Sequence, residues 1–91
     1  MTIEQVLRNV LDKVLASVDA PGLQPLTGES NLIENLDSLT IVDMLLEAEM
    51  QLEKATGRYL TLADETIFDA SKSPLRTWKG WLAYVESKHA S

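Results

Sequence analysis

The chain has 91 residues, of which 45% are hydrophobic and 24% charged, and its formal net charge at pH 7 is −6. This length fits one domain with a modest core, and the apolar content is too high for a disordered acidic tail. Nucleic-acid binders need a basic surface that displaces counterions, so the negative charge argues against nucleic acid and anionic membranes as ligands. We expect basic protein partners instead.

Features missing from the sequence exclude further classes of protein. There is no cysteine, which excludes disulfides, thiolate metal sites and a catalytic thiol. No apolar run approaches the roughly 20 residues that span a bilayer. Charges interrupt the apolar positions of the N-terminal segment, unlike those of a secretory signal. We therefore expect a cytoplasmic domain without a membrane span.

The first helix is expected over residues 2–18. Apolar residues recur there at three- and four-residue spacing, as in an amphipathic helix: Ile3, Val6, Leu7, Val10, Leu11, Val14, Leu15 and Val18. Thr2 and Gln5 have the spacing of a capping box at its start. Pro21 and Gly22 follow its predicted end.

A long loop is expected over residues 20–36, because prolines, glycines and Asn31 interrupt any helical period there. Leucines and Ile33 are spaced through this segment. We therefore expect the loop to lie against the core. Loops of this length are uncommon in compact domains and are often functional.

Three further helices are expected, over residues 38–55, 64–70 and 74–88. Lys54 is favourably placed in the last turn of the first of these, before Gly57. Asp64 is expected to cap the short second one. Ser73 followed by Pro74 is a strong signal for the start of the last one.

These elements predict one all-α domain over residues 1–91. It is expected to be a small four-helix bundle of three longer helices and one short helix, with a long loop between helices one and two. In the last helix, Trp78 and Trp81 lie three residues apart on one face. Core packing is the favoured interpretation of this pair, and the alternative is that one of them lines an acyl or partner site.

The helix expected over residues 38–55 carries two apolar stripes. At about 100° per residue, one stripe holds Ile41, Leu45, Ala48 and Leu52, and the opposite one holds Leu39, Val42, Leu46 and Met50. Asp43 and Glu47 flank the second stripe on one edge, and Glu49 flanks it on the other. Either this stripe is a docking surface rimmed by carboxylates, or the long loop buries it. Periodicity leaves both interpretations open.

Ser38 lies at the start of this helix, where Asp37 can act as the cap. Unpaired N–H groups and the helix dipole favour a bound anion at this end. A phosphodiester on the Ser38 hydroxyl would therefore be electrostatically stable. On local sequence alone, however, Asp37 and Ser38 are best interpreted as a simple capping pair, because a three-residue motif is common.

The wider context resembles the acyl carrier protein family. The resemblance rests on Asp37-Ser38-Leu39, the acidic amphipathic helix after it, the long loop before it and the four-helix order. It extends from Ile3 to Val85, and the family's Asp-Ser-Leu motif is matched in full, with Leu36 in the apolar position before it.

This resemblance implies a function. In that family the motif serine carries 4′-phosphopantetheine as a phosphodiester, and acyl groups are bound to its terminal thiol. Ser38 is then the attachment site, and Asp37 assists the phosphopantetheinyl transferase that installs the arm. The implied partner-binding residues are the apolar Leu39, Val42 and Leu46 and the acidic Asp43, Glu47 and Glu49. The thiol that the sequence lacks would be imported on the arm.

Some positions depart from the family pattern. Asn35 replaces the usual glycine two residues before the motif aspartate, although asparagine also tolerates a left-handed backbone. Thr40 stands where an acidic residue is common. These differences favour a specialised stand-alone carrier for a polyketide, an unusual lipid or an aminoacyl group. Its implied partners are the transferase, an acyl- or aminoacyl-loading ligase and downstream biosynthetic enzymes, and we expect a monomer.

Other functional classes are less well supported. The single histidine, His89, lies near the end of the last predicted helix, and nothing places it beside Ser38 as a hydrolase requires. Asp64, Glu65 and Asp69 resemble a solvated short helix more than a metal site. We therefore expect neither an enzyme nor a metal protein. The remaining alternative is a non-enzymatic acidic helical adaptor that binds partner proteins without a prosthetic group, which assigns no role to Ser38.

Overall fold

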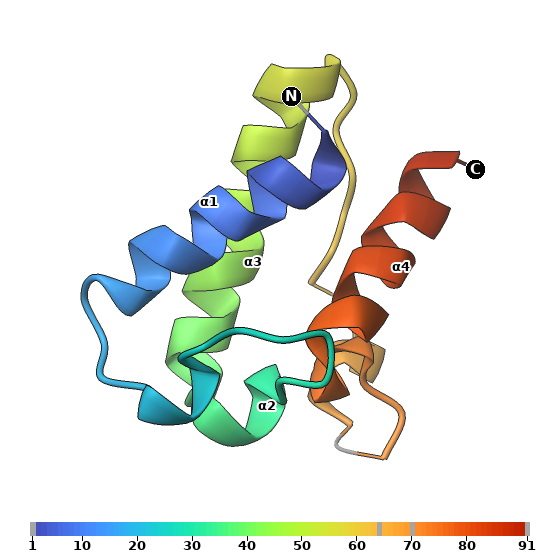
Figure 1. Ribbon diagram of the computed structural model, residues 1–91. Coiled ribbons are helices and arrows are strands. Elements are labelled where there is room, and N and C mark those ends of the chain that lie inside the picture. The colour runs from blue at the N-terminus through green and yellow to red at the C-terminus, as the bar shows by residue number, and fades with distance from the viewer. Residues whose placement is uncertain (1, 64, 70, 91) are drawn as a thin grey trace.

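The computed structural model describes residues 2–63, 65–69 and 71–90, which form helices and connecting loops but no strand (Figure 1). The three longer helices are α1 (Ile3–Leu15), α3 (Ser38–Thr56) and α4 (Trp78–Ala90). The short helix α2 (Leu32–Asn35) precedes α3, and 3₁₀ turns cover Pro21–Leu23, Glu65–Phe68 and Pro74–Arg76. The predicted all-α class and small helical bundle are confirmed.

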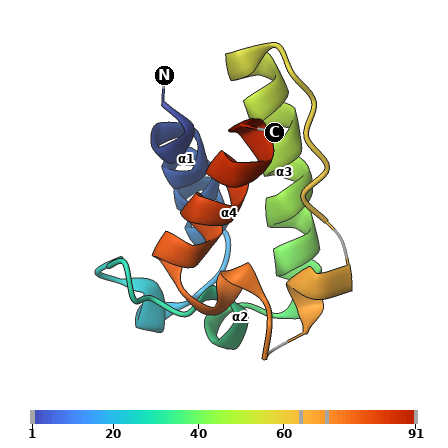
Figure 2. The same cartoon turned by 90° about the vertical axis from the view of Figure 1, so that its right-hand side faces the viewer.

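The core lies among the three longer helices. α1 packs along α3, and α4 packs against α1 (Figures 1 and 2). The buried residues of these helices are Val6, Leu7, Val10 and Leu11 of α1, Ile41, Met44, Leu45, Ala48 and Leu52 of α3, and Trp78, Trp81 and Val85 of α4. The two indole rings meet edge to face with centroids 5.8 Å apart. Core packing of both tryptophans is confirmed.

α1 begins as predicted and ends earlier than predicted. The Thr2 hydroxyl accepts from the backbone N–H of Gln5 at 3.1 Å, and the Thr2 N–H donates to the Gln5 side chain at 2.9 Å. The predicted end near residue 18 is wrong, because the regular helix stops at Leu15. After Leu15 the N–H and the hydroxyl of Ser17 both donate to the Val14 carbonyl, three residues back, and the Val18 N–H donates to the same carbonyl, so the last turn is irregular.

The segment predicted as a long loop contains one turn of 3₁₀ helix and the short α2. The prediction that it lies against the core is confirmed, since Leu23, Leu32 and Leu36 are buried. The Asn31 side chain caps α2 by accepting from the Glu34 N–H at 3.0 Å. A helix this short carries too few residues for a hydrophobic period, so the sequence did not indicate it.

The same loop determines where α4 begins. The predicted start at Pro74 is wrong: Ser73 caps only a 3₁₀ turn, and an extended Thr77 separates that turn from α4. The Thr77 hydroxyl accepts from the Gly80 N–H at 3.0 Å. The first two N–H groups of α4, on Trp78 and Lys79, donate to loop carbonyls of residues 30 and 28 at 2.8 and 3.0 Å. Tertiary hydrogen bonds therefore set this helix terminus.

The short helix predicted over residues 64–70 is a 3₁₀ turn over Glu65–Phe68. Ile67 of this turn is buried in the core. The predicted cap, Asp64, lies outside the described residues. The short α-helix of the bundle is thus α2, which lies before α3 rather than after it.

Gly22 lies close to Asn35, the residue that stands where the acyl carrier protein family usually has glycine. A Cβ at Gly22 would overlap the side-chain oxygen of Asn35, whose amide nitrogen donates to the Asn31 carbonyl at 2.7 Å. Asn35 is the last residue of α2, and no non-glycine residue in the described part of the chain has a positive φ. The Asn35 side chain therefore fills the space beside Gly22 and forms a hydrogen bond to Asn31. Asn35 is not a left-handed turn residue.

We predict that Gly22→Ala lowers the free energy of unfolding by about 1–2 kcal/mol, because the added methyl group displaces a hydrogen-bonded side chain. Urea denaturation measures the change. Gly28→Ala is the matched control, since its Cβ would meet only Lys79 carbons at 3.7 Å, and its effect should stay within about 0.5 kcal/mol. Asn35→Ala should reduce the cost of Gly22→Ala. Equal effects at Gly22 and Gly28 would contradict this interpretation.

Candidate functional site

The start of α3 presents Ser38 at the surface. Asp37 is the N-cap, and its carboxylate accepts from the Thr40 N–H at 2.8 Å, as predicted. This backbone hydrogen bond is the main reason that the pKa of Asp37 lies below its ordinary value, and the Thr40 side chain contributes in the same direction. Ser38 is the first residue of α3 and is exposed. A hydroxyl in this position is accessible to another protein.

The structure rules out one interpretation of the second apolar stripe, which is that the long loop buries it. The first stripe, Ile41, Leu45, Ala48 and Leu52, is buried as predicted. On the second stripe the exposed fraction is 76% for Leu39, 50% for Leu46 and 54% for Met50, while Val42 is half-buried. The long loop does not cover this stripe. α3 therefore presents an apolar surface that starts next to Ser38.

All three predicted acidic residues lie beside the exposed stripe, but only Asp43 and Glu47 are not buried. Asp43 is exposed. Glu47 forms an ion pair with Lys13 of α1, and the Gln51 amide donates to its second oxygen at 3.4 Å. The hydrogen bond from Lys13 is the main reason that the pKa of Glu47 is lowered. Glu47 therefore also ties α3 to α1.

Glu49 lies at the edge of the exposed stripe, as predicted, but it is buried, with only 4% of the residue exposed. Its carboxylate accepts from the Tyr59 hydroxyl at 2.8 Å, from the Leu62 N–H at 2.7 Å and from the Ala63 N–H at 3.3 Å. These donors belong to the extended segment after α3, which runs back along the helix (Figure 2). The prediction that Glu49 meets basic partner residues is therefore corrected: Glu49 fastens this segment to α3.

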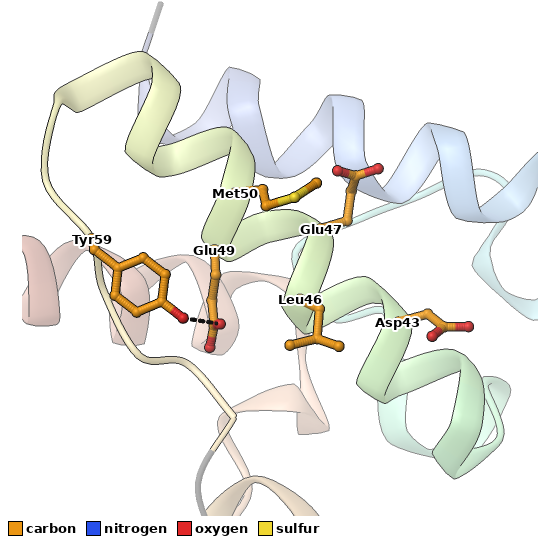
Figure 3. A pocket seen from close by; sticks show the side chains of 6 residues that line it. All are labelled: Asp43, Leu46, Glu47, Glu49, Met50 and Tyr59. Atoms are coloured by element: carbon orange, nitrogen blue, oxygen red, sulfur yellow. Dashed lines mark hydrogen bonds between the residues drawn. The ribbon is translucent and has the colours of Figure 1, made fainter.

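A groove of about 370 Å³ opens between α3 and the extended segment (Figure 3). It is lined by Asp43, Leu46, Glu47, Glu49, Met50 and Tyr59. Tyr59 was not predicted as a site residue, because its only signal in the sequence is an aromatic side chain in a short link after Gly57. The residue is 57% exposed, and the hydrogen bond from its hydroxyl to Glu49, together with the charges of Glu49 and Glu53, raises its pKa.

No family model, curated protein or solved structure matches this chain. Functional inference therefore depends on the geometry of its own residues. Within the described ranges, no group of three or more His, Asp or Glu residues could hold a metal ion. No helix formed by those residues is long and apolar enough to cross a bilayer. His89 is near the C-terminal end of α4, at the opposite end of the molecule from the start of α3 (Figure 1).

We predict that Glu49→Ala lowers the free energy of unfolding by about 2–3 kcal/mol, because it leaves the buried Leu62 N–H without its charged acceptor. Glu49→Gln should cost about 1–2 kcal/mol, since one amide oxygen can still accept. Urea denaturation measures both changes. Glu53→Ala, an exposed glutamate of the same helix, should stay within about 0.5 kcal/mol. A Glu49→Ala protein as stable as Glu53→Ala would show that these hydrogen bonds contribute nothing.

We also predict a pH-dependent contribution from Asp37. Because its folded-state pKa lies below the ordinary value of 3.8, the charged carboxylate stabilises the protein above that value, and this contribution is lost as the pH falls through the folded-state pKa. The stability difference between wild type and Asp37→Ala should therefore be largest near neutral pH and shrink in acid. Urea denaturation of both proteins across this range provides the measurement.

Asp37→Asn is the control for this pH dependence, because it retains a neutral cap acceptor. Its advantage over Asp37→Ala should change little with pH. A difference between wild type and Asp37→Ala that stays constant into strong acid would contradict the role of the charged cap.

Proposed function

We propose that this chain is a carrier protein. It tethers acyl or aminoacyl intermediates as thioesters on a 4′-phosphopantetheine arm attached to Ser38, and it presents them to partner enzymes. The observation that carries this proposal is the exposure of Ser38 at the capped start of α3, directly beside an exposed apolar stripe. The chain itself acts as a substrate of the modifying and loading enzymes, not as an enzyme.

The start of α3 suits the phosphodiester of such an arm. The first N–H groups of a helix have no partner within it, and its dipole favours a negative charge there. Asp37 takes up the Thr40 N–H and fixes the helix start without covering Ser38. The arm would supply a terminal thiol for thioester formation, a group that this cysteine-free chain does not encode.

The exposed stripe suits the partner enzymes. Leu39 and Leu46 are at least half exposed, and Val42 is half-buried between them. An exposed apolar surface next to a modification site is typical of protein docking. Leu46 lies about 12 Å along α3 from Ser38, at 1.5 Å per residue, so an enzyme on this stripe has Ser38 within its footprint. Asp43 adds a carboxylate that favours a basic partner.

A second candidate function is an acidic helical adaptor that binds partner proteins without a prosthetic group. It is favoured by one observation, which is that the exposed stripe of α3 is complete without any modification of Ser38. This function uses Leu39, Leu46 and Met50 but leaves Ser38 without a role. The two candidates therefore differ in a single covalent step.

We predict that incubation with coenzyme A and a broad-specificity phosphopantetheinyl transferase adds one phosphopantetheine group, detected as one mass increment in the intact protein. Ser38→Ala should abolish the increment, because it removes the acceptor hydroxyl. Ser71→Ala, at another exposed serine, should leave it unchanged. Circular dichroism of both variants checks that the helices are intact. A wild-type protein that several transferases leave unmodified would contradict the carrier function and favour the adaptor.

A further inference from the structure

We propose that a second groove, between α1 and α3, binds an extended acidic segment of a partner protein. This α1–α3 groove has a volume of about 390 Å³. It is lined by Val6, Asn9, Gln51, Lys54 and Ala55. It lies outside the site of the proposed function and binds this segment whether or not Ser38 carries an arm.

The α1–α3 groove differs in charge from the chain as a whole. The chain has 14 acidic residues and a net charge of −6, but none of the described residues that line this groove is acidic. Lys54 contributes a positive charge, and within the part of the chain that the structure describes it forms no ion pair. The groove therefore attracts an anionic group, although the molecule as a whole repels one.

Two acidic residues of α3 lie near Lys54 without neutralising it. Glu47 is already paired with Lys13. The hydrogen bond from Lys13 is the main cause of the lowered pKa of Glu47, and the charge of Lys54 adds to it, so both cations lie on the α1 side of α3. Glu53 precedes Lys54 in the sequence, but its charge acts on Tyr59, whose pKa it raises. Lys54 is thus left to meet a carboxylate from outside the chain.

The two amide side chains of the groove favour a peptide over a free anion. Asn9 belongs to α1 and Gln51 to α3. An amide side chain has N–H donors and an acceptor oxygen, and a peptide bond presents the complementary acceptor and donor. Gln51 donates one hydrogen bond to Glu47 at 3.4 Å, and an amide can form further ones through its oxygen and its second N–H. Phosphate and free carboxylates act mainly as acceptors, so they use only half of this capacity.

The size and floor of the groove suit an extended segment. Its volume of about 390 Å³ lies near the lower end of the roughly 300–1,000 Å³ of ligand pockets. This space fits a few residues of extended chain rather than a helix, whose diameter with side chains is about 10–12 Å. Val6 is buried, and the small side chain of Ala55 lets a second backbone approach α3 closely.

A second copy of the chain is a poorer occupant. A two-fold symmetric contact through this groove would bring the two Lys54 side chains together, with no carboxylate among the described lining residues to separate them. A carboxylate of one copy in the groove of the next would be a head-to-tail contact, which generates a ring or an open chain of molecules. A segment of a different protein meets neither obstacle.

The position of the groove leaves Ser38 accessible. Lys54 lies about 24 Å along α3 from Ser38, at 1.5 Å per residue. A segment bound between α1 and α3 therefore does not cover the start of α3. The groove can hold one protein while Ser38 is presented to another.

The test uses a short acetylated and amidated peptide in which two glutamates alternate with leucines, titrated into the ¹⁵N-labelled protein. The control peptide has glutamines in place of the glutamates. We expect saturating amide shifts confined to residues 5–13 and 47–56, with affinity about fivefold lower for the glutamine peptide. Because the protein is itself negative, non-specific electrostatics would give the opposite order.

Equal affinity for both peptides, or tighter binding of the glutamine peptide, would overturn the proposal. Shifts centred on the exposed stripe of α3 would do the same. Inorganic phosphate that shifts the same residues with an affinity similar to that of the glutamate peptide would also overturn it, in favour of a simple anion site.

Variants locate the binding. Lys54→Glu reverses the charge in the groove and should reduce glutamate-peptide affinity about tenfold. Gln51→Leu should weaken both peptides alike, because it removes an amide that meets the peptide backbone. Lys72→Glu makes the same charge change at an exposed lysine that does not line the groove, and it should bind like wild type. Equal effects of Lys54→Glu and Lys72→Glu, in proteins whose helices are intact by circular dichroism, would overturn the proposal.

The transferase reaction separates this groove from the carrier function. A protein that binds the glutamate peptide as expected but that no transferase modifies would contradict the carrier function alone. A protein that accepts the arm but prefers the glutamine peptide would contradict the groove proposal alone. Sedimentation showing head-to-tail chains that Lys54→Glu abolishes would overturn the groove proposal in favour of a second copy.

Discussion

The structure depends on a helix with two apolar faces, of which the domain buries one. α3 buries Ile41, Leu45 and Leu52 against the rest of the core. α1, with Lys13 paired to Glu47, holds α3 along one side. The extended segment holds the other side through the three hydrogen bonds to Glu49. The remaining face of α3, with Leu39, Leu46 and Met50, stays exposed. An exposed apolar face that none of the described elements covers is the feature that any function must explain.

Ser38 and the groove beside Tyr59 lie at different positions along α3. Ser38 stands at the start of α3, where a tethered phosphodiester gains from the helix dipole. The groove lies further along, where Leu46 and Met50 meet the ring of Tyr59. Under the proposed carrier function, a partner that contacted both positions would be oriented on α3, and the group on Ser38 would reach its active site in one direction. Glu49 contributes to this arrangement without being presented at the surface, since its bond to Tyr59 fixes the groove wall.

Much of the fold follows from local sequence, and much of the site does not. The cap formed by Thr2 and Gln5, the cap at Asp37 and the buried stripe of α3 all arise from residues within a few turns of one another, so spacing alone predicts them. The start of α4 at Trp78 is different, because distant loop carbonyls accept its first N–H groups. The burial of Glu49 could not be predicted for the same reason. A helical period gives the direction of a side chain, but it does not show which distant segment will pack over that side chain. Tyr59 joins the groove only through that packing.

We propose that Ser38 carries a phosphopantetheine arm and that α3 presents it. The most direct measurement is peptide mapping by mass spectrometry of the protein isolated from its own cells, combined with ³¹P NMR of the intact chain. The carrier function predicts a phosphodiester signal and a phosphopantetheine group on the peptide that contains Ser38, with or without a thioester on its thiol. A protein that binds its partners while Ser38 is unmodified in all molecules, and that gives no phosphorus signal, would contradict the claim and leave the adaptor as the function of the exposed face.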